Sequence, residues 1–215
     1  MSLTRCFGGN AMSHYEQIPY LAGGRELCVT GCALLTASAD LLGKTIRWCE
    51  GGEAFCSHAA GVVRFPASLV ARERVTLIES LTHGPVLTYL SRYFEDFKGR
   101  LFLFLPAGLT PEIQQGFAAW LLDKALLQTP YDWLGLGRQI VRHVAQDATA
   151  LFCSEAVGMA WEAAGLPRRP AAPVGLAPQP KDLPVWWPGR VVELVGPFAA
   201  TDHGAQVPQI LAKTA

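Results

Sequence analysis

The chain has little charge of either sign and no excess of one. Of its 215 residues only 17% are charged, and 18 Lys and Arg balance 18 Asp and Glu, which gives a formal net charge of zero. Proteins whose main partner is nucleic acid carry basic patches or runs, so this composition argues against that class of partner. Half of the residues are hydrophobic, which argues against a disordered chain and predicts a folded domain.

Long apolar runs are also missing. No uninterrupted stretch approaches the ~20 apolar residues that a membrane-spanning helix needs, so we expect no transmembrane segment. The first 25 residues contain Arg5, Glu16 and Arg25 and lack the apolar core of a secretory signal. These absences predict a cytoplasmic protein, with export by another route left open.

The six cysteines follow no recognisable disulfide or metal-binding pattern. A chain of this length and apolar content does not need disulfides for stability, so reduced thiols are expected. The stretch with Cys28, Cys32, Cys49, Cys56 and His58 is rich in possible zinc ligands, but its spacing matches no common finger or ribbon. We therefore expect no metal and no other cofactor, and keep structural zinc as the lesser alternative.

Patterns of apolar residues, prolines and glycines predict an α+β domain. Segments rich in β-branched residues predict strands, and Thr110-Pro111-Glu112 is a typical helix start. The expected strands are Gly24–Gly31, His58–Phe65, Val75–Ser80, Val86–Tyr89, Arg100–Leu105 and Arg190–Val195, and the expected helices are Leu41–Cys49, Thr110–Gln128 and Leu151–Gly165. Strands that cluster between helices favour a central antiparallel sheet packed against helices over alternating βαβ units.

The two ends of the chain carry weaker patterns than its middle. We expect residues 1–23 to form an irregular N-terminal arm, residues 24–195 one domain, and residues 196–215 a loose C-terminal tail. Nine of the fifteen prolines follow residue 165. Because proline interrupts helices and strands, residues 166–189 are expected to be a largely extended wrap within the domain.

Cys153 and His58 form the core of a candidate site. Cys153 and the following Ser154-Glu155 stand in the first turn of an expected helix, where free amides and the helix dipole favour a thiolate. His58 opens an expected strand and would be the general base that takes the thiol proton and returns it to the leaving group. The alternative for Cys153 is an inert core residue, and the alternative base is His143, ten residues before Cys153.

Glu79 and Tyr131 complete the candidate site. Glu79 stands in an otherwise apolar strand, where a carboxylate is costly unless it is paired. If strand Val75–Ser80 lies beside the strand that starts at His58, Glu79 can meet the imidazole across the sheet and orient it. Tyr131 is a candidate donor to the oxyanion that develops during attack, together with the amide of Cys153. A solvent-facing position is the alternative for Glu79, and simple packing the alternative for Tyr131.

Several segments together carry a family resemblance. They are Gly24–Gly31, Leu42–Trp48, Cys56-Ser57-His58 with Gly61-Val62-Val63, Leu77-Ile78-Glu79-Ser80, Pro130-Tyr131-Asp132 with Phe152-Cys153-Ser154-Glu155, and Pro180–Leu183. In this order they resemble the circularly permuted NlpC-type, papain-like hydrolases, in particular the YiiX-like branch, over residues 24–195. The resemblance implies a papain-like α+β fold with Cys153, His58 and Glu79 as a triad. Ala59-Ala60 departs from the branched residue and glycine that usually follow the histidine.

The residues and the resemblance together predict a cysteine hydrolase. Cys153 would form an acyl thioester with an amide or ester substrate, while His58 moves the proton and Glu79 orients His58. A small peptide, a cell-wall peptide or an N-acyl lipid is the expected substrate. Transfer of the acyl group to another acceptor is left open, as is the oligomeric state. The alternative is a papain-like module that binds a peptide or lipid without turnover.

Overall fold

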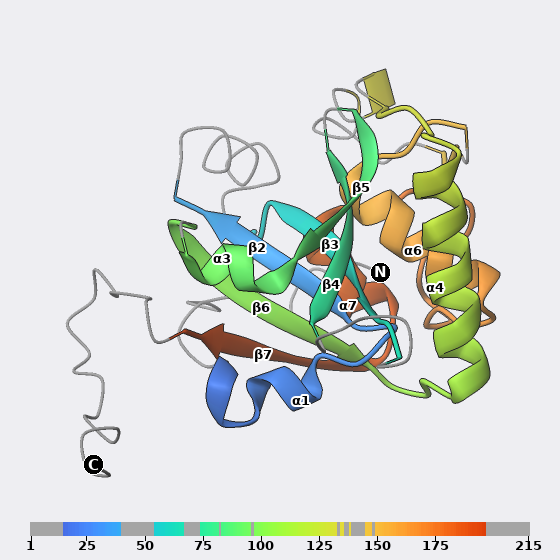
Figure 1. Ribbon diagram of the computed structural model, residues 1–215. Helices are drawn as coiled ribbons and strands as arrows, with labels where there is room; N and C mark the ends of the chain where they lie inside the picture. The colour runs from blue at the N-terminus through green and yellow to red at the C-terminus, as the bar shows by residue number, and fades with distance from the viewer. Residues whose placement is uncertain are drawn as a thin grey trace, which may run out of the picture.

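One seven-stranded sheet with helices on both faces makes up the domain (Figure 1), in an α+β arrangement as expected. The computed structural model describes residues 15–39, 54–66, 74–81, 83–95, 97–132, 134–135, 138, 145–147 and 149–196. The strands are β1 (Gln17–Pro19), β2 (Ala33–Ser38), β3 (His58–Arg64), β4 (Val75–Leu81), β5 (Gly84–Tyr89), β6 (Gly99–Pro106) and β7 (Gly189–Val195). The helices are α1 (Arg25–Leu27), α3 (Leu90–Glu95), α4 (Pro111–Leu126), α6 (Cys153–Ala163) and α7 (Leu183–Trp186), with short helical turns η1 (Tyr20–Gly24) and η2 (Pro180–Asp182).

The sheet is antiparallel except at one edge. Its strand order is β1-β7-β6-β2-β3-β4-β5, and only the β1–β7 pair is parallel. The expected central antiparallel sheet is therefore confirmed. Within the described residues, no helix is both long and apolar enough to cross a membrane.

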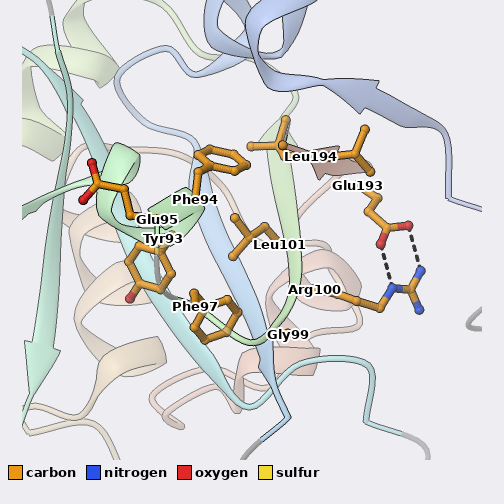
Figure 2. A pocket seen from close by; sticks show the side chains of 11 residues that line it. Tyr93, Phe94, Glu95, Phe97, Gly99, Arg100, Leu101, Glu193 and Leu194 are labelled. Carbon is orange, nitrogen blue, oxygen red and sulfur yellow. Dashed lines mark hydrogen bonds and ion pairs between the residues drawn. The ribbon is translucent and has the colours of Figure 1, made fainter. Parts of the chain in front are cut away.

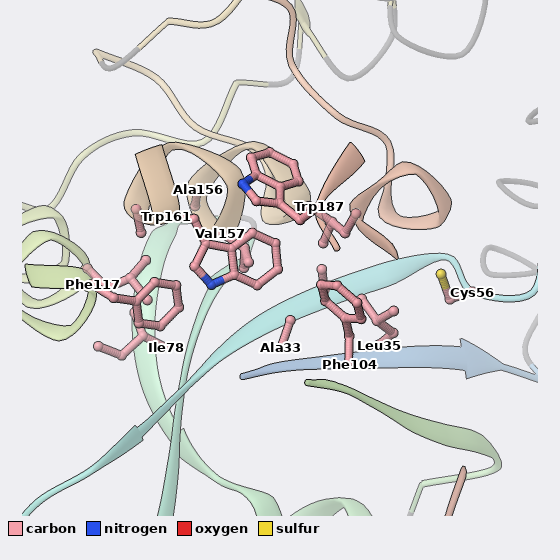
Figure 3. Close-up of a cluster of buried hydrophobic side chains, with 14 of the residues drawn as sticks. Ala33, Leu35, Cys56, Ile78, Phe104, Phe117, Ala156, Val157, Trp161 and Trp187 are labelled. Atoms are coloured by element: carbon pink, nitrogen blue, oxygen red, sulfur yellow. The ribbon is translucent and has the colours of Figure 1, made fainter. Parts of the chain in front are cut away.

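Each face of the sheet has its own hydrophobic core. Helices α4, α6 and α7 cover one face, where Trp161 packs against Phe104, Phe117 and Trp187 (Figure 3). The indole of Trp161 is fully buried and donates to the backbone oxygen of Gly31 at 2.8 Å. Truncating a buried ring of this size typically costs about 3–5 kcal/mol. The turn η1 and helices α1 and α3 cover the opposite face, so α6 and α3 approach the sheet from opposite sides.

Strands β3 and β4 separate at the end that carries the candidate site. Their pairing runs from Arg64–Val75 to Gly61–Ile78 and stops there, although β3 continues back to His58 and β4 continues to Leu81. The chain before α6 lies in this opening, because the hydroxyl of Ser80 donates to the backbone oxygen of Leu151 at 2.7 Å. The separation of the two strands therefore brings the start of α6 beside the start of β3.

The expected strand Gly24–Gly31 was wrong. This stretch contains α1 and a turn that ends at Gly31, whose φ of 95° lies in the left-handed region. The true strand, β2, begins two residues later and lies between β3 and β6, where no strand was expected. Almost all of β2 is buried on both faces, so it lacks the alternation of apolar and polar residues that marks a half-exposed strand.

The structure confirms some of the other predicted segments and differs from the rest. Strands β3 to β7 and helices α4 and α6 lie where the sequence predicted them, within a few residues. Residues 166–189 contain no long helix or strand, but they are not simply extended: turns and bends lie at 170–175, Leu176 forms an isolated bridge, and η2 and α7 follow. The arm expected to be irregular contributes strand β1, whose Gln17 donates to Glu193 on β7 at 3.1 Å. The expected helix Leu41–Cys49 lies outside the described residues.

Candidate active site

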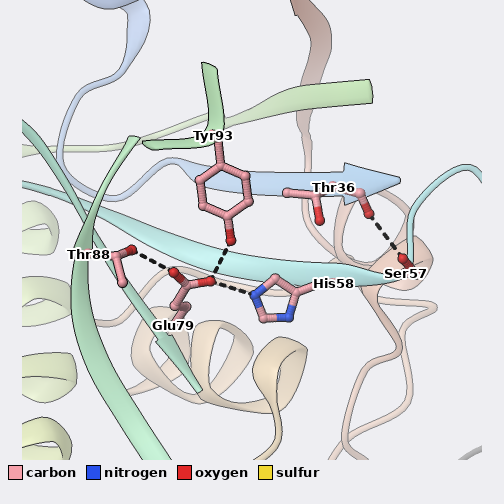
Figure 4. A network of polar contacts seen from close by, with 6 residues as sticks. All are labelled: Thr36, Ser57, His58, Glu79, Thr88 and Tyr93. Atoms are coloured by element: carbon pink, nitrogen blue, oxygen red, sulfur yellow. Dashed lines mark hydrogen bonds and ion pairs between the residues drawn. The ribbon is translucent and has the colours of Figure 1, made fainter. Parts of the chain in front are cut away.

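The side chains of His58 and Glu79 meet across the sheet, as their strands predicted. The distance from His58 Nε2 to Glu79 Oε2 is 2.9 Å (Figure 4). Glu79 is 4% exposed, and it also accepts hydrogen bonds from Thr88 on β5 at 2.5 Å and from Tyr93 on α3 at 2.6 Å. Glu79 therefore does not lie on a solvent-exposed face of its strand.

Hydrogen bonding overcomes burial at Glu79. Burial favours the neutral carboxyl, but the hydrogen bonds from His58, Thr88 and Tyr93, with the positive charge of His58, lower the pKa of Glu79 below its ordinary value. A carboxylate that accepts several hydrogen bonds remains ionised even where little water reaches it. The carboxylate in this apolar strand is thus paired with the imidazole, as the cost of an unpaired buried charge predicted.

Cys153 is the first residue of α6 and lies against His58. Around its sulfur, the side chain of His58 and the backbone amides of Ala59 and Ser154 are the hydrogen-bonding groups that lower the pKa of the thiol. Ala59 lies beyond the last β3–β4 pair, so its amide can serve the sulfur and not the next strand. Burial opposes the thiolate, but the charge of His58 and these hydrogen bonds lower the pKa of the thiol.

His58 is held as an imidazolium between the two acidic groups. Burial alone would lower the pKa of His58, but the thiolate of Cys153 and the carboxylate of Glu79 raise it to about 10. Because Nε2 faces Glu79, Nδ1 is the ring nitrogen left to face the sulfur. The side chain of His58 is 22% exposed whereas Cys153 is 5% exposed, so solvent reaches this pair mainly at the imidazole.

The start of α6 is fixed by its neighbours. Ser154 is buried and donates through its hydroxyl to the backbone oxygen of Pro178 at 2.7 Å. Glu155, also buried, accepts from the amides of Asp147 at 2.7 Å and of Phe152 at 3.5 Å. Both residues after Cys153 thus satisfy polar groups around the first turn, as residues at helix starts commonly do.

Tyr131 lies near Cys153, where the sequence predicted an oxyanion donor. The amide of Leu151 donates to the oxygen of Pro130 at 3.0 Å, which sets the segment with Tyr131 beside the chain that leads into Cys153. Burial, and then the negative charges of Cys153 and Asp132, raise the pKa of Tyr131 above its ordinary value. Its hydroxyl therefore keeps its proton for donation, and its role in stabilising an oxyanion stays a prediction.

Cys28 and Cys32 have the opposite character. Both are fully buried on the α1 side of the sheet, and burial raises the pKa of each thiol to about 12. Across the residues that the structure describes, no three side chains of His, Cys, Asp or Glu lie together as metal ligands would. Cys49 and the alternative base His143 lie outside the described residues.

The sequence did not predict a role in the site for Thr88, Tyr93 or the amide of Ala59. Thr88 stands in an expected strand, and pairing of β5 with β4 would have placed it opposite Leu77, two residues from Glu79. Tyr93 belongs to α3, a helix of six residues for which the sequence gave no expectation. The role of the Ala59 amide depends on where β3 and β4 separate, and no residue type in the sequence signals that.

Comparison with known proteins places the chain in no family. No protein-family model matches it, and no curated protein matches it either.

Proposed function

We propose that the protein is a cysteine hydrolase or acyltransferase in which Cys153 is the nucleophile, His58 the general base and acid, and Glu79 the residue that orients His58. The contact that carries this proposal is the 2.9 Å pair of His58 Nε2 with Glu79 Oε2, on a ring whose other side serves the sulfur of Cys153. A thiolate beside an imidazolium is a strong nucleophile with a proton donor next to it.

The reaction begins with attack of the Cys153 thiolate on a carbonyl carbon. A C–S bond forms and the carbonyl π electrons move to oxygen, where the amide of Cys153 and the hydroxyl of Tyr131 are the proposed donors. When the oxyanion collapses, the C–N or C–O bond breaks and His58 gives its proton to the leaving amine or alkoxide. An acyl thioester and a neutral His58 remain.

The second half of the reaction regenerates the thiolate. Neutral His58 takes a proton from water, whose oxygen attacks the thioester carbonyl while the C–S bond breaks. The products are a carboxylic acid and the original pair of ions. An amine or alcohol in place of water gives acyl transfer with the same movements of protons.

The fold and substrate that fit this proposal are those implied by the resemblance. In chain order the site runs from His58 on β3 to Glu79 on β4 and then to Cys153 at the start of α6. This is the order of the circularly permuted papain-like hydrolases. We propose this papain-like, permuted architecture for residues 24–195. An amide or ester of a small peptide, a cell-wall peptide or an N-acyl lipid is the substrate class.

Trapping the acyl group on Cys153 tests the proposal directly. The full chain is mixed with a panel of acyl amides and acyl esters, quenched in acid and measured by intact mass. We expect a mass increase equal to one acyl group, mapped to Cys153 and absent from the Cys153→Ala variant. In parallel, iodoacetamide at pH 6 should modify Cys153 faster than the other five cysteines.

Two results would contradict the proposal. Slow and uniform labelling of all cysteines at pH 6 would show that Cys153 is an ordinary thiol. Selective labelling without any acyl adduct across a broad panel would favour a module that binds a ligand without turnover.

A further inference from the structure

Tyr93 connects the candidate site to the opposite face of the sheet. Its hydroxyl donates to Oε2 of Glu79 at 2.6 Å, the same oxygen that contacts His58 Nε2. Thr88 donates to the other oxygen, Oε1, at 2.5 Å (Figure 4). Three donors from three different elements, β3, β5 and α3, thus converge on one carboxylate.

The ring of Tyr93 is held in place by aromatic neighbours. It meets Phe97 edge to face with centroids 5.2 Å apart, and the adjacent Phe94 stacks on Tyr20 at 4.5 Å. Figure 2 shows Tyr93, Phe94 and Phe97 along one side of a pocket. A tyrosine hydroxyl on a ring fixed in this way is aimed at Glu79 by packing, at little entropic cost for its hydrogen bond.

A phenylalanine would pack equally well against these rings, so packing alone does not account for the hydroxyl. A protonated carboxyl has one oxygen that must donate, and that oxygen conflicts with donors already pointing at it. Hydrogen bonds to both oxygens therefore favour the ionised form, in agreement with the lowered pKa of Glu79. An ionised Glu79 in turn stabilises His58 as the imidazolium.

We propose that Tyr93, assisted by Thr88, is a positioning residue that keeps Glu79 ionised and aligned, and thereby maintains Cys153 and His58 as an ion pair. This inference rests on the proposed function. It assigns control of the Cys153–His58 ion pair to Tyr93, which touches neither the substrate nor the sulfur. Among the residues that the structure describes, the titratable groups that face the ion pair are Glu79 from β4, Tyr93 from α3 and Tyr131 from the segment before α6.

The test is the pH dependence of iodoacetamide labelling at Cys153, which reports thiolate without needing a substrate. In Tyr93→Phe the ring stays and one donor is lost, so we expect the apparent pKa for labelling to rise by about one unit. Labelling below that pKa should then slow roughly tenfold. Tyr89→Phe removes a hydroxyl from a half-exposed tyrosine on β5 and should leave the profile unchanged.

A second pair of variants keeps the inference testable if Tyr93→Phe does not fold. Thr88→Val should also raise the apparent pKa for labelling of Cys153. Thr88→Ser, which retains the hydroxyl, should keep the wild-type value. If a folded Tyr93→Phe protein had the same labelling profile as the wild type, the proposed role of Tyr93 would be overturned and the proposed function would not. If wild-type Cys153 itself titrates as an ordinary thiol, the proposed function and this inference both fail.

Discussion

Buried thiols on the two sides of the sheet behave in opposite ways. Cys28 and Cys32 are completely buried, and Cys153 is 5% exposed, so burial does not distinguish them. The pKa of each thiol in the first pair is raised to about 12, whereas that of Cys153 is lowered. Burial is the largest effect at each of the three and always raises the pKa, so the neighbours decide the outcome.

The charge beside the sulfur, more than its hydrogen bonds, explains the difference between Cys32 and Cys153. The thiol of Cys28 donates to the oxygen of Gly24 at 3.2 Å, and that of Cys32 to the oxygen of Leu27 at 3.6 Å. A donated hydrogen bond stabilises the neutral thiol. Cys32 also has a backbone hydrogen bond, from Val29, that lowers the pKa of its thiol, but burial outweighs it. At Cys153 the charge of His58 acts together with two backbone amides, and this combination outweighs burial. The imidazolium and the backbone amides together therefore lower the pKa of Cys153 despite its burial.

The largest expected effect comes from removing the imidazolium. In His58→Ala the thiol of Cys153 loses its cationic partner, so its pKa should rise to the ordinary range or above. Its labelling rate by iodoacetamide at pH 6 should then fall roughly 10³-fold, in proportion to the thiolate fraction. His83→Ala, at an exposed position in the β4–β5 turn, is the matched control. Retention of fast labelling in His58→Ala would identify another base, with His143 the first candidate.

A smaller change should follow from neutralising Glu79. Glu79→Gln keeps the shape and an acceptor but removes the charge that helps to raise the pKa of His58 to about 10. The pH above which the imidazolium is lost should move down, and labelling of Cys153 at pH 6 should fall roughly 10- to 100-fold. A labelling profile from pH 5 to 10 measures both changes. If the pH above which the imidazolium is lost did not change, Glu79 would not be the group that stabilises the charged ring of His58.

Glu155 extends the comparison to a buried carboxyl. It accepts two amide hydrogen bonds, yet burial and the nearby charges of Asp132 and Asp147 raise its pKa from 4.5 to about 8. Because its folded pKa is raised, the stability linked to it is complete below about pH 4.5 and is lost as pH rises through 8. The free energy of unfolding should fall by about 1 kcal/mol per pH unit across that window.

The Glu155→Gln variant separates this contribution from the other titrations. It should show a flatter dependence of unfolding free energy on pH between 5 and 8, measured by urea unfolding at several pH values. Since Gln keeps one acceptor, the variant should match or exceed the wild type in stability at pH 8. An equally steep loss in both proteins would assign the pH dependence to other groups.

The smallest effect is expected at the inert thiols. Cys32→Ala removes a buried sulfur on the face of the sheet opposite to α6, so stability should fall by about 1 kcal/mol. The rate and pH profile of labelling at Cys153 should not change. Thermal unfolding and peptide mapping check the two parts, and altered labelling of Cys153 would break the contrast between the two regions.

The local parts of the fold could be predicted from the sequence. The start of α4 followed from Thr110 and Pro111, and the side chain of Thr110 indeed accepts from the amide of Ile113 at 3.3 Å. Strands β3 and β4 followed from their β-branched residues. Glu79 and His58 could then be paired because a costly charge in an apolar strand needs a partner.

What depends on tertiary contacts could not be predicted. Strand β2 is buried on both faces by elements distant in sequence, so it carries no periodic pattern. Helix α3 has six residues, too few for a helical period to appear, and this concealed the contact of Tyr93 with Glu79. Strand β1 is three residues long and forms only because β7 offers its edge.

The early end of β3–β4 pairing has a consequence for how the site comes into being during folding. If the pairing of the two strands extended further, the Ala59 amide would donate to a carbonyl of β4. The sulfur of Cys153 would then lose a hydrogen-bond donor. Longer pairing of β3 with β4 and docking of the start of α6 therefore exclude each other, because both use the Ala59 amide. Substitutions that stabilise the longer sheet should impair the nucleophile even where they raise overall stability, in the manner of a stability–activity trade-off.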